Sequence, residues 1–353
     1  MSMHLAVAGW LLGSHSGANR RLLALLEEAH AFLDDDDRVS VLCQPSFTPP
    51  PLPRIEWRSV SIPGTPTWRR AFAEQRQLGS LLHELGANVY DHGFLPAPRV
   101  GIPLCLTIHD VRAADNEGNW PPFIARSVLR KSLRRAAGVV TVSEWTASRL
   151  RALMPSCKPQ VVANGVHDLE PGPLPQPIPP NGYILHVGHL EPRKNLGVLL
   201  EALARIEPAQ RPELWLVGRD AGAWPELNKQ AGRLGVQAFV RHIGIVSDGH
   251  LPAYYHDARL LALPSRYEGF GLPALEARIH GTRVAVANTT ALPEVVGDGA
   301  KLPVNDPAAW ARVMAESPNE NLQTIQRRAA DAAACSWSNA SHAWLNILKK
   351  LVR

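Results

Sequence analysis

Two glutamates, eight positions apart and separated by a glycine-flanked aromatic turn, have the types and spacing to hold a sugar nucleotide. Carboxylates accept hydrogen bonds from sugar hydroxyls, and glycines let the backbone approach a ligand closely. Amide groups at a helix start can receive phosphate oxygens. The donor-binding candidates in this stretch are Glu268, Gly269, Phe270, Gly271, Leu272 and Glu276.

A plainer interpretation makes Glu276 a solvated helix residue and Glu268 a charge that favours the helix dipole. The unbroken string from Pro264 to Glu276 favours a ligand site instead. The apolar run Arg259–Leu263 before it predicts a buried parallel strand. Such a strand delivers Glu268 to its carboxyl end, where ligands of open α/β sheets collect.

Two adjacent cations, Arg193 and Lys194, follow a second predicted strand and the turn at Gly188. Placed there they can neutralise a diphosphate, and arginine adds bidentate geometry. The dipeptide alone is common on solvated surfaces, but its spacing from Gly188 favours phosphate. Because the departing charge would be stabilised by these cations, we expect no essential Mg²⁺ or Mn²⁺.

The string Pro264–Ala277 resembles the E-x7-E signature of retaining family 4 glycosyltransferases, which typically reads P-S-x-x-E-G-F-G-L-P-x-x-E-A. Further matches to that family occur at His186–Asn195, Leu216–Gly218 and Leu292–Asp298. The resemblance implies the GT-B fold, with two Rossmann-like parallel-sheet domains that face each other across a cleft.

The resemblance also implies roles for single residues. Arg193 and Lys194 would hold the donor diphosphate, Glu268 the donor-sugar hydroxyls and Glu276 the ribose. His109, after the strand Ile102–Ile108, would position the donor sugar and stabilise the oxocarbenium charge. A bland alternative is that His109 merely packs.

The nucleotide base is expected near Gly218 and Ile245, where backbone groups can read its edge. The family further implies retention of anomeric configuration, and we favour front-face substitution in which the donor phosphate takes the acceptor proton. The wording of His186–Asn195 is similar to mannosyltransferases and suggests GDP-mannose, but the sequence does not decide guanine against uracil.

An N-terminal loop departs from the family pattern. Relatives commonly show G-G-x-G-R after the first strand, where the backbone touches the donor. Residues 16–20 here read Ser-Gly-Ala-Asn-Arg, so only Gly17 and Arg20 match. We expect Ser16 or Asn19 to supply side-chain hydrogen bonds in place of the lost glycines.

A proline-rich segment marks the domain organisation. Residues 169–181 are expected to be a linker between an acceptor-binding domain, 1–168, and a donor-binding domain, 182–336. The final helix, 337–353, is expected to pack on the first domain. Helical patterns at Arg20–Phe32 and Phe72–Leu85 alternate with strands, which indicates parallel sheets. The expected strands are His4–Gly9, Arg38–Gln44, Asn88–His92, Ile102–Ile108, Gly138–Val142, Gln160–Ala163, Tyr183–Val187, Glu213–Val217, Phe239–Ile243, Arg259–Leu263 and Arg283–Ala287.

Composition agrees with a two-domain enzyme. The 353 residues are 45% hydrophobic, enough for two cores. No long apolar run or signal-like N-terminus is present, so we expect a cytoplasmic protein. The four scattered cysteines indicate neither disulfides nor zinc, and no cofactor is expected. The acidic run Asp34–Asp37 is interpreted as a solvated turn.

Partners are suggested by charge. The net charge of +5 favours anionic surfaces, and residues 123–137 form a basic amphipathic pattern that could rest on anionic lipid at the inner face of the cytoplasmic membrane. A solvated helix face is equally compatible, and nothing indicates nucleic acid.

Three function classes stay open. The leading one is a hexosyltransferase that acts on a saccharide or lipid-linked acceptor in cell-surface polysaccharide or lipopolysaccharide assembly. The alternatives are another GT-B enzyme, such as a nucleotide-sugar epimerase, or a catalytically silent sugar-nucleotide-binding subunit.

Overall fold

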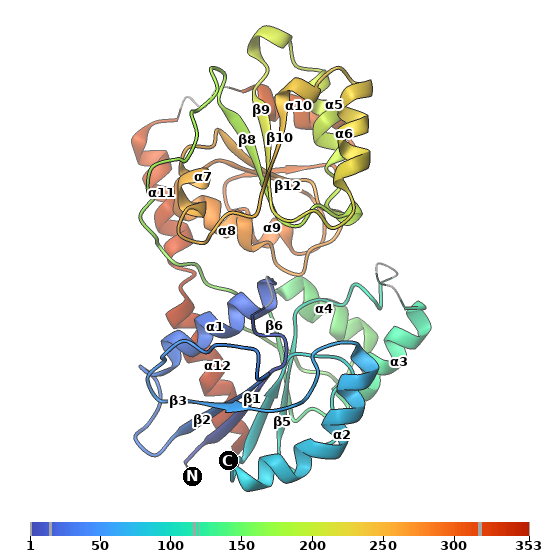
Figure 1. The fold of residues 1–353 in the computed structure, drawn as a ribbon, viewed down its shortest axis with the longest axis vertical. Coiled ribbons are helices and arrows are strands. Elements are labelled where there is room, and N and C mark those ends of the chain that lie inside the picture. The colour runs from blue at the N-terminus through green and yellow to red at the C-terminus, as the bar shows by residue number, and fades with distance from the viewer. Residues whose placement is uncertain (1, 14–15, 116–117, 119, 317–319, 353) are drawn as a thin grey trace. The chain divides into compact units, whose positions relative to one another are not determined.

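The computed structural model describes residues 2–13, 16–115, 118, 120–316 and 320–352. The chain divides into an N-terminal unit, made of Met1–Gly165 and Ser336–Arg353, and a C-terminal unit, Val166–Cys335 (Figure 1). The proline-rich stretch 169–181, all of which is described, contains no helix or strand and belongs to the C-terminal unit.

The described part of the N-terminal unit holds a seven-stranded parallel sheet in the order β3-β2-β1-β4-β5-β6-β7. The order reverses direction at β1 and β4, as in doubly wound folds. Its strands are β1 His4–Gly9, β2 Arg38–Cys43, β3 Ile55–Ser59, β4 Val89–His92, β5 Leu104–Ile108, β6 Gly138–Thr141 and β7 Gln160–Val161. Its helices are α1 Gly17–Ala29, α2 Thr67–Glu84, α3 Pro122–Leu133, α4 Glu144–Leu153 and α12 Trp337–Val352.

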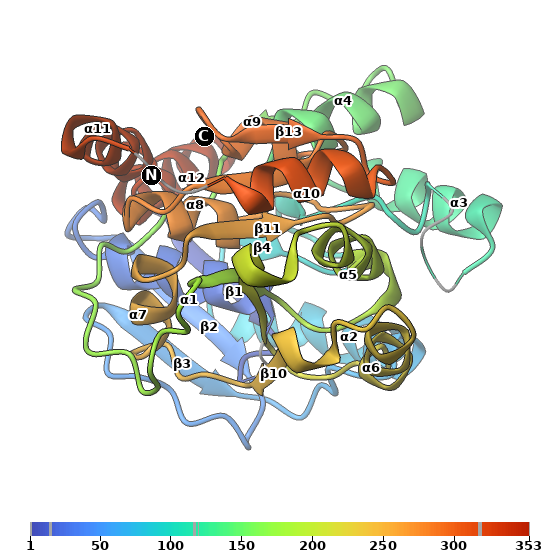
Figure 2. The same ribbon diagram turned by 90° about the horizontal axis from the view of Figure 1, so that it is seen from above.

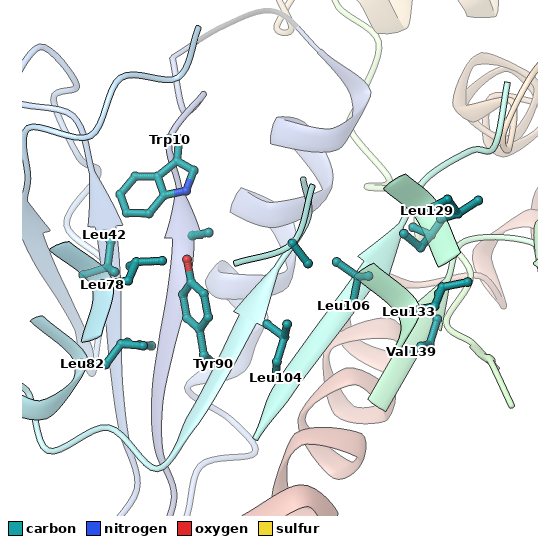
Figure 3. Packing of buried hydrophobic residues seen from close by; sticks show 14 of the residues in the cluster. Trp10, Leu42, Leu78, Leu82, Tyr90, Leu104, Leu106, Leu129, Leu133 and Val139 are labelled. Atoms are coloured by element: carbon teal, nitrogen blue, oxygen red, sulfur yellow. The ribbon is translucent and has the colours of Figure 1, made fainter. Parts of the chain in front are cut away.

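Alternation along the strands divides the apolar side chains between the two faces of this sheet. One face packs with α2, α3 and α4 in a single core cluster. Trp10, Leu78 and Tyr90 are grouped at one end of this cluster, and Leu129 lies at the opposite end (Figure 3). Burying each such side chain contributes roughly 1.5–3 kcal/mol to folding.

Helix α12 packs against α1 on the other face, although some 300 residues separate them in sequence (Figure 1). The Ser341 hydroxyl donates to the Leu25 carbonyl at 2.8 Å. Lys349 Nζ lies 2.8 Å from Asp34 Oδ2 and 2.9 Å from Asp37 Oδ2. The final helix therefore completes the N-terminal unit.

The described part of the C-terminal unit holds a six-stranded parallel sheet in the order β10-β9-β8-β11-β12-β13. Helices α5, α6 and α10 pack together, and α8 packs with α7, α9 and α11 (Figure 2). The strands are β8 Tyr183–Val187, β9 Glu213–Val217, β10 Val240–Gly244, β11 Leu260–Leu263, β12 Val284–Ala287 and β13 Ala300–Leu302. The helices are α5 Gly197–Ala204, α6 Trp224–Arg233, α7 Leu251–His256, α8 Leu272–Ile279, α9 Leu292–Val295, α10 Pro307–Ala315 and α11 Leu322–Ala333, with 3₁₀ turns at Pro192–Lys194, Pro208–Gln210 and Gln237–Phe239.

The α/β class and parallel sheets predicted from the sequence are confirmed, but two strands were missed. Both β3 and β13 are sheet edges with little buried surface, and β3 carries Glu56 and Arg58. Charged edge strands discourage aggregation but lack the apolar run that identifies a strand.

The acidic run was only partly predicted correctly. Asp34 lies in an exposed turn, whereas the side chain of Asp37 is buried and accepts from the Met3 amide at 2.8 Å. Burial opposes its ionisation, but this amide and Lys349 lower the pKa of Asp37 overall. The run therefore ends in a structural anchor for the first strand.

No helix within the described residues is long and apolar enough to cross a membrane.

Candidate active site

A charge cluster lies at the carboxyl ends of β8 and β11 in the C-terminal unit. Lys194 Nζ is 2.5 Å from Glu268 Oε1, and Arg193 Nη1 is 3.1 Å from Glu268 Oε2. Ser265 donates to Glu268 Oε1 at 2.8 Å. Arg193 also reaches Glu191 at 2.6 Å and the Tyr267 carbonyl at 2.9 Å. The two cations and the carboxylate predicted from separate motifs thus meet in one place.

The electrostatics of this cluster favour ionised groups. Burial would raise the pKa of Glu268, but Lys194 and then Arg193 lower it to about 2. The backbone amide of Glu268 is held as well, since it donates to Thr290 Oγ1 at 3.0 Å. A permanently ionised Glu268 is an acceptor for hydroxyl groups and a poor proton donor.

Glycines shape the backbone beside the cluster. A Cβ on Gly218, whose φ is +138°, would lie 2.1 Å from the Gly188 carbonyl oxygen. Gly188 has φ +147°, and its own Cβ would approach Lys194 Nζ to 3.2 Å. The ends of β8 and β9 therefore meet backbone to backbone, which only glycine allows.

Gly271 is the N-cap residue of helix α8. It has φ +108°, and a Cβ there would lie 2.8 Å from Leu292 Cδ2. Leu272 is the first residue of α8 and Phe270 is buried just before it, while Gly269 is half-buried in the turn. The glycine therefore lets the chain enter the helix at a tight turn.

Glu276 lies on α8 and is 8% exposed, which excludes the solvated-helix interpretation. Its Oε2 accepts from the Tyr255 hydroxyl at 2.6 Å. The Tyr255 ring stacks on His280, with centroids 6.0 Å apart. A buried carboxylate held in this way is preorganised to accept further hydrogen bonds.

The two residues expected near the base follow neighbouring strands, Gly218 after β9 and Ile245 after β10. The Gly218 amide donates to the Gly244 carbonyl at 2.7 Å, and His242 Nε2 donates to the Gly218 carbonyl at 2.9 Å. Ile245, the next residue, is 61% exposed. Ile245 thus presents an exposed apolar side chain beside hydrogen-bonded backbone groups.

Sequence reasoning missed His186, which is fully buried on β8. Its Nδ1 donates to the Ala262 carbonyl at 3.0 Å, which leaves Nε2 as a bare acceptor near Gly188. Burial, and then Lys194, lower the pKa of His186 to about 4. Its position two residues before Gly188 could have drawn attention to it, but the sequence analysis assigned His186 only to a predicted strand and gave it no role.

In the N-terminal unit, His109 lies within the electrostatic influence of Arg21. His109 follows β5, and a Cβ on Gly93 would lie 3.5 Å from its Nε2. Burial and then Arg21 lower the pKa of His109 to about 3, so the ring is neutral. Arg21 is buried on α1 and donates to Asn164 Oδ1 at 2.6 Å. Sequence reasoning missed Arg21 because its partner lies more than 140 residues away.

Residues 16–20, which depart from the glycine-loop pattern of the family, form the start of α1. Ser16 is the N-cap of α1 and Gly17 its first residue. Ser16 Oγ accepts from the Asn19 amide at 3.3 Å, and the Asn19 side chain donates to the Leu11 carbonyl. The Ser16 side chain thus caps the start of α1, and the Asn19 side chain ties that start to the preceding turn.

No group of three or more His, Cys, Asp or Glu side chains within the described ranges has the geometry to hold a metal ion. All four cysteines are free.

Comparison with known proteins gives two adjoining family matches. Residues 15–168 match the model described as Glycosyltransferase Family 4, and residues 181–317 match the model described as Glycosyl transferases group 1. Together these models account for most of the chain.

Curated relatives agree. The chain is 32% identical over 244 residues to O-antigen chain mannosyltransferase B of Escherichia coli, covering 63% of each chain. It is 32% identical over 292 residues to D-inositol 3-phosphate glycosyltransferase of Streptomyces avermitilis, covering 72% of this chain and 62% of that protein. The matched region therefore spans less than two thirds of either relative.

Solved structures share the fold along the whole chain. Sucrose-phosphate synthase from Thermosynechococcus elongatus superposes with a TM-score of 0.76 at 17% identity, covering 99% of both chains. Anabaena HepE in complex with UDP-glucose gives 0.71 at 17% identity, covering 99% of this chain and 100% of that one. With two parallel-sheet units, a charge cluster at the motif positions and both family matches, the chain belongs to the family 4 glycosyltransferases and has the GT-B fold.

Proposed function

We propose that this chain is a retaining glycosyltransferase that moves a hexosyl unit from a nucleoside-diphosphate sugar to a saccharide or lipid-linked acceptor in cell-surface polysaccharide or lipopolysaccharide assembly. The observation that carries this is the pairing of Glu268 with Arg193 and Lys194 beside glycines that let the backbone pack closely. Family membership and the mannosyltransferase relative support it.

The cluster suits a diphosphate leaving group. Arg193 pairs with Glu191 and Lys194 pairs with Glu268. A bound diphosphate would replace part of these carboxylate contacts with its own oxygens. As the bond from the anomeric carbon to the diphosphate breaks, the two cations would stabilise the developing charge. We propose that this step needs no metal; unchanged turnover in a chelator would support that, and loss restored by Mg²⁺ would contradict it.

The acceptor hydroxyl would bond to the anomeric carbon from the face that the diphosphate leaves, and its proton would pass to a donor phosphate oxygen. Glu268, ionised and hydrogen-bonded, would orient the sugar hydroxyls, and Glu276 the ribose. Neutral His109 would stabilise the positive charge on the sugar. NMR of the first-formed product tests the retention on which this mechanism depends, because an inverted anomeric centre would contradict it.

The donor is tested by a thermal-shift panel of GDP-mannose and UDP-hexoses, followed by turnover with the tightest binder. A ligand at 100 times its Kd stabilises a protein by about 2.7 kcal/mol. A shift with GDP-mannose alone supports a mannosyl donor, as the relative suggests. A shift with UDP-sugars alone rejects it.

The same panel separates the alternatives. Binding without transfer to any acceptor would indicate a silent subunit. An epimeric nucleotide sugar formed without acceptor would indicate an epimerase. The absence of any shift would contradict the proposed donor site.

We also propose contact with an anionic membrane surface through α3. The helix is shorter than residues 123–137, but Phe123 is 73% exposed and Ile124 40% exposed, and Arg130 and Lys131 are exposed beside them. Exposed aromatic and basic side chains on one helix suit an anionic interface. Pelleting with anionic but not neutral liposomes at physiological salt is expected; full recovery in the supernatant would remove the proposal.

A further inference from the structure

A hollow of about 830 Å³ lies within the N-terminal unit, at the carboxyl ends of three neighbouring strands. Its lining residues follow β1, β2 and β3 directly, so the sheet order brings three short segments together. Those segments are residues 10–13, 44–48 and 60–65.

The lining is polar but uncharged. One residue in five of the chain is charged, yet none of the described residues that line the hollow is Asp, Glu, Lys, Arg or His. Phe47 is half-buried and supplies an aromatic side chain to the lining, whereas Trp10 and Ile62 are each 1% exposed and belong to the core cluster beside it. The polar side chains are Gln44, Ser46, Thr48, Ser61 and Thr65.

The wall beside Trp10 is fixed. The Trp10 ring lies in the core cluster (Figure 3). Its indole Nε1, the only polar atom of this side chain, donates to buried Glu74 Oε1 at 2.7 Å. Gln44 Nε2 donates to the Ile62 carbonyl at 3.2 Å and joins two of the segments. A Cβ on Gly64 would lie 2.6 Å from the Trp10 carbonyl oxygen, so close packing needs that glycine.

A phosphate would lose hydration in this hollow without gaining a cation, and desolvating an unpaired charge is expensive. A neutral sugar has a smaller desolvation cost, because its hydroxyls replace hydrogen bonds to water with hydrogen bonds to neutral polar side chains. The C–H face of the sugar can also lie on an aromatic ring. We propose that the hollow holds an uncharged glycosyl residue of the acceptor and excludes a phosphorylated one. The assignment to an acceptor rests on the proposed transferase function.

The test is saturation-transfer NMR on the full chain without donor. The probes are methyl glycosides of mannose, glucose and galactose, against glucose 6-phosphate. The wild type is expected to bind at least one neutral glycoside. It should bind glucose 6-phosphate more weakly by a factor of about ten or more, or not at all. Equal or tighter binding of the phosphate, or failure of all neutral glycosides, would overturn the inference.

Location is tested by placing a cation in the lining. Ser61→Arg and Thr48→Arg should each weaken the neutral glycoside about tenfold and gain affinity for the phosphate. Ser80→Arg, on the exposed side of α2, is the matched control and should change neither. Unchanged glycoside binding in both hollow variants would place the site elsewhere.

The donor-induced thermal shift of each variant shows that it is folded and that its donor site is intact. A normal donor shift without glycoside binding contradicts this inference alone. Glycoside binding at the hollow without any transfer contradicts the proposed function alone.

Discussion

Two glutamates with little exposure to solvent, one in each unit, behave in opposite ways. Glu268 is sandwiched by Lys194 at 2.5 Å and Arg193 at 3.1 Å, and its pKa falls to about 2. Glu74 lies 3.6 Å from Arg70, and burial raises its pKa to about 7 despite that cation and the Trp10 hydrogen bond. Burial acts in the same direction on both, so the cation geometry decides.

The difference separates the tasks of the units. The C-terminal cluster keeps Glu268 ionised beside closely packed glycine turns, which suits electrostatic stabilisation of a diphosphate. Around Glu74, burial keeps His92 neutral as well, with a pKa of about 3. That network braces Trp10 behind an uncharged hollow. In our proposals, the charge cluster of the C-terminal unit stabilises the leaving group and the hollow of the N-terminal unit binds a neutral sugar.

The largest expected effect is on catalysis. Lys194→Ala removes the nearest partner of Glu268 and a cation for the leaving group, so kcat should fall about 10²–10³-fold. Steady-state kinetics measure this. Lys229→Ala, exposed on α6, is the control. Near-normal kcat in Lys194→Ala would erase the functional side of the comparison.

A glycine substitution should disrupt the backbone contact beside the C-terminal cluster without removing any of its charged side chains. Gly218→Ala should cost roughly 3 kcal/mol or more of unfolding free energy, because its Cβ meets the Gly188 carbonyl. Gly222→Ala is the matched control, with φ +98° and open space around it, and should cost about 1–2 kcal/mol. Chemical denaturation measures both; equal losses would show that backbone strain alone matters.

The N-terminal glutamate should be visible in the pH dependence of stability. The folded pKa of Glu74 is raised above its unfolded value, so its contribution is present at low pH and is lost as pH rises through about 7. Glu74→Gln should therefore reduce the loss of unfolding free energy between pH 5 and 8 by about 2 kcal/mol.

Denaturation at several pH values tests this, with exposed Glu84→Gln on the same helix as control. An unchanged pH slope in Glu74→Gln would mean that the two glutamates do not differ as described.

The smallest effect concerns the start of α1. If Ser16 is a helix cap, Ser16→Ala should cost about 1 kcal/mol and leave the donor KM unchanged. Ser16→Asp should restore the stability, since aspartate caps equally well. A raised donor KM with unchanged stability would return Ser16 to the donor site and blur the division between the units.

Much of the C-terminal unit could be predicted because its signals are local. The strand before Glu268, the turn at Gly271 and the pair Arg193–Lys194 each occupy a few consecutive residues. Apolar runs and glycines act over that same range. Even so, the sequence did not show that Arg193 and Lys194 pair with Glu268, because those contacts join residues more than 70 positions apart.

The N-terminal unit was harder to predict for the same reason. Its hollow is made by three segments that only the strand order brings together, and Arg21 meets Asn164 across most of the unit. The segment after β1 reads as a degenerate glycine loop, but its hydrogen bonds make it a helix start.

The sequence by itself determined the α/β class, the family and the residue types of the candidate donor site, since these depend on periodicity and contiguous motifs. Only the tertiary structure decided which buried charges are paired, and therefore that Glu268 stays ionised while Glu74 titrates near neutrality. The physical reason is that a pKa depends on distances of a few ångströms between groups far apart in the chain.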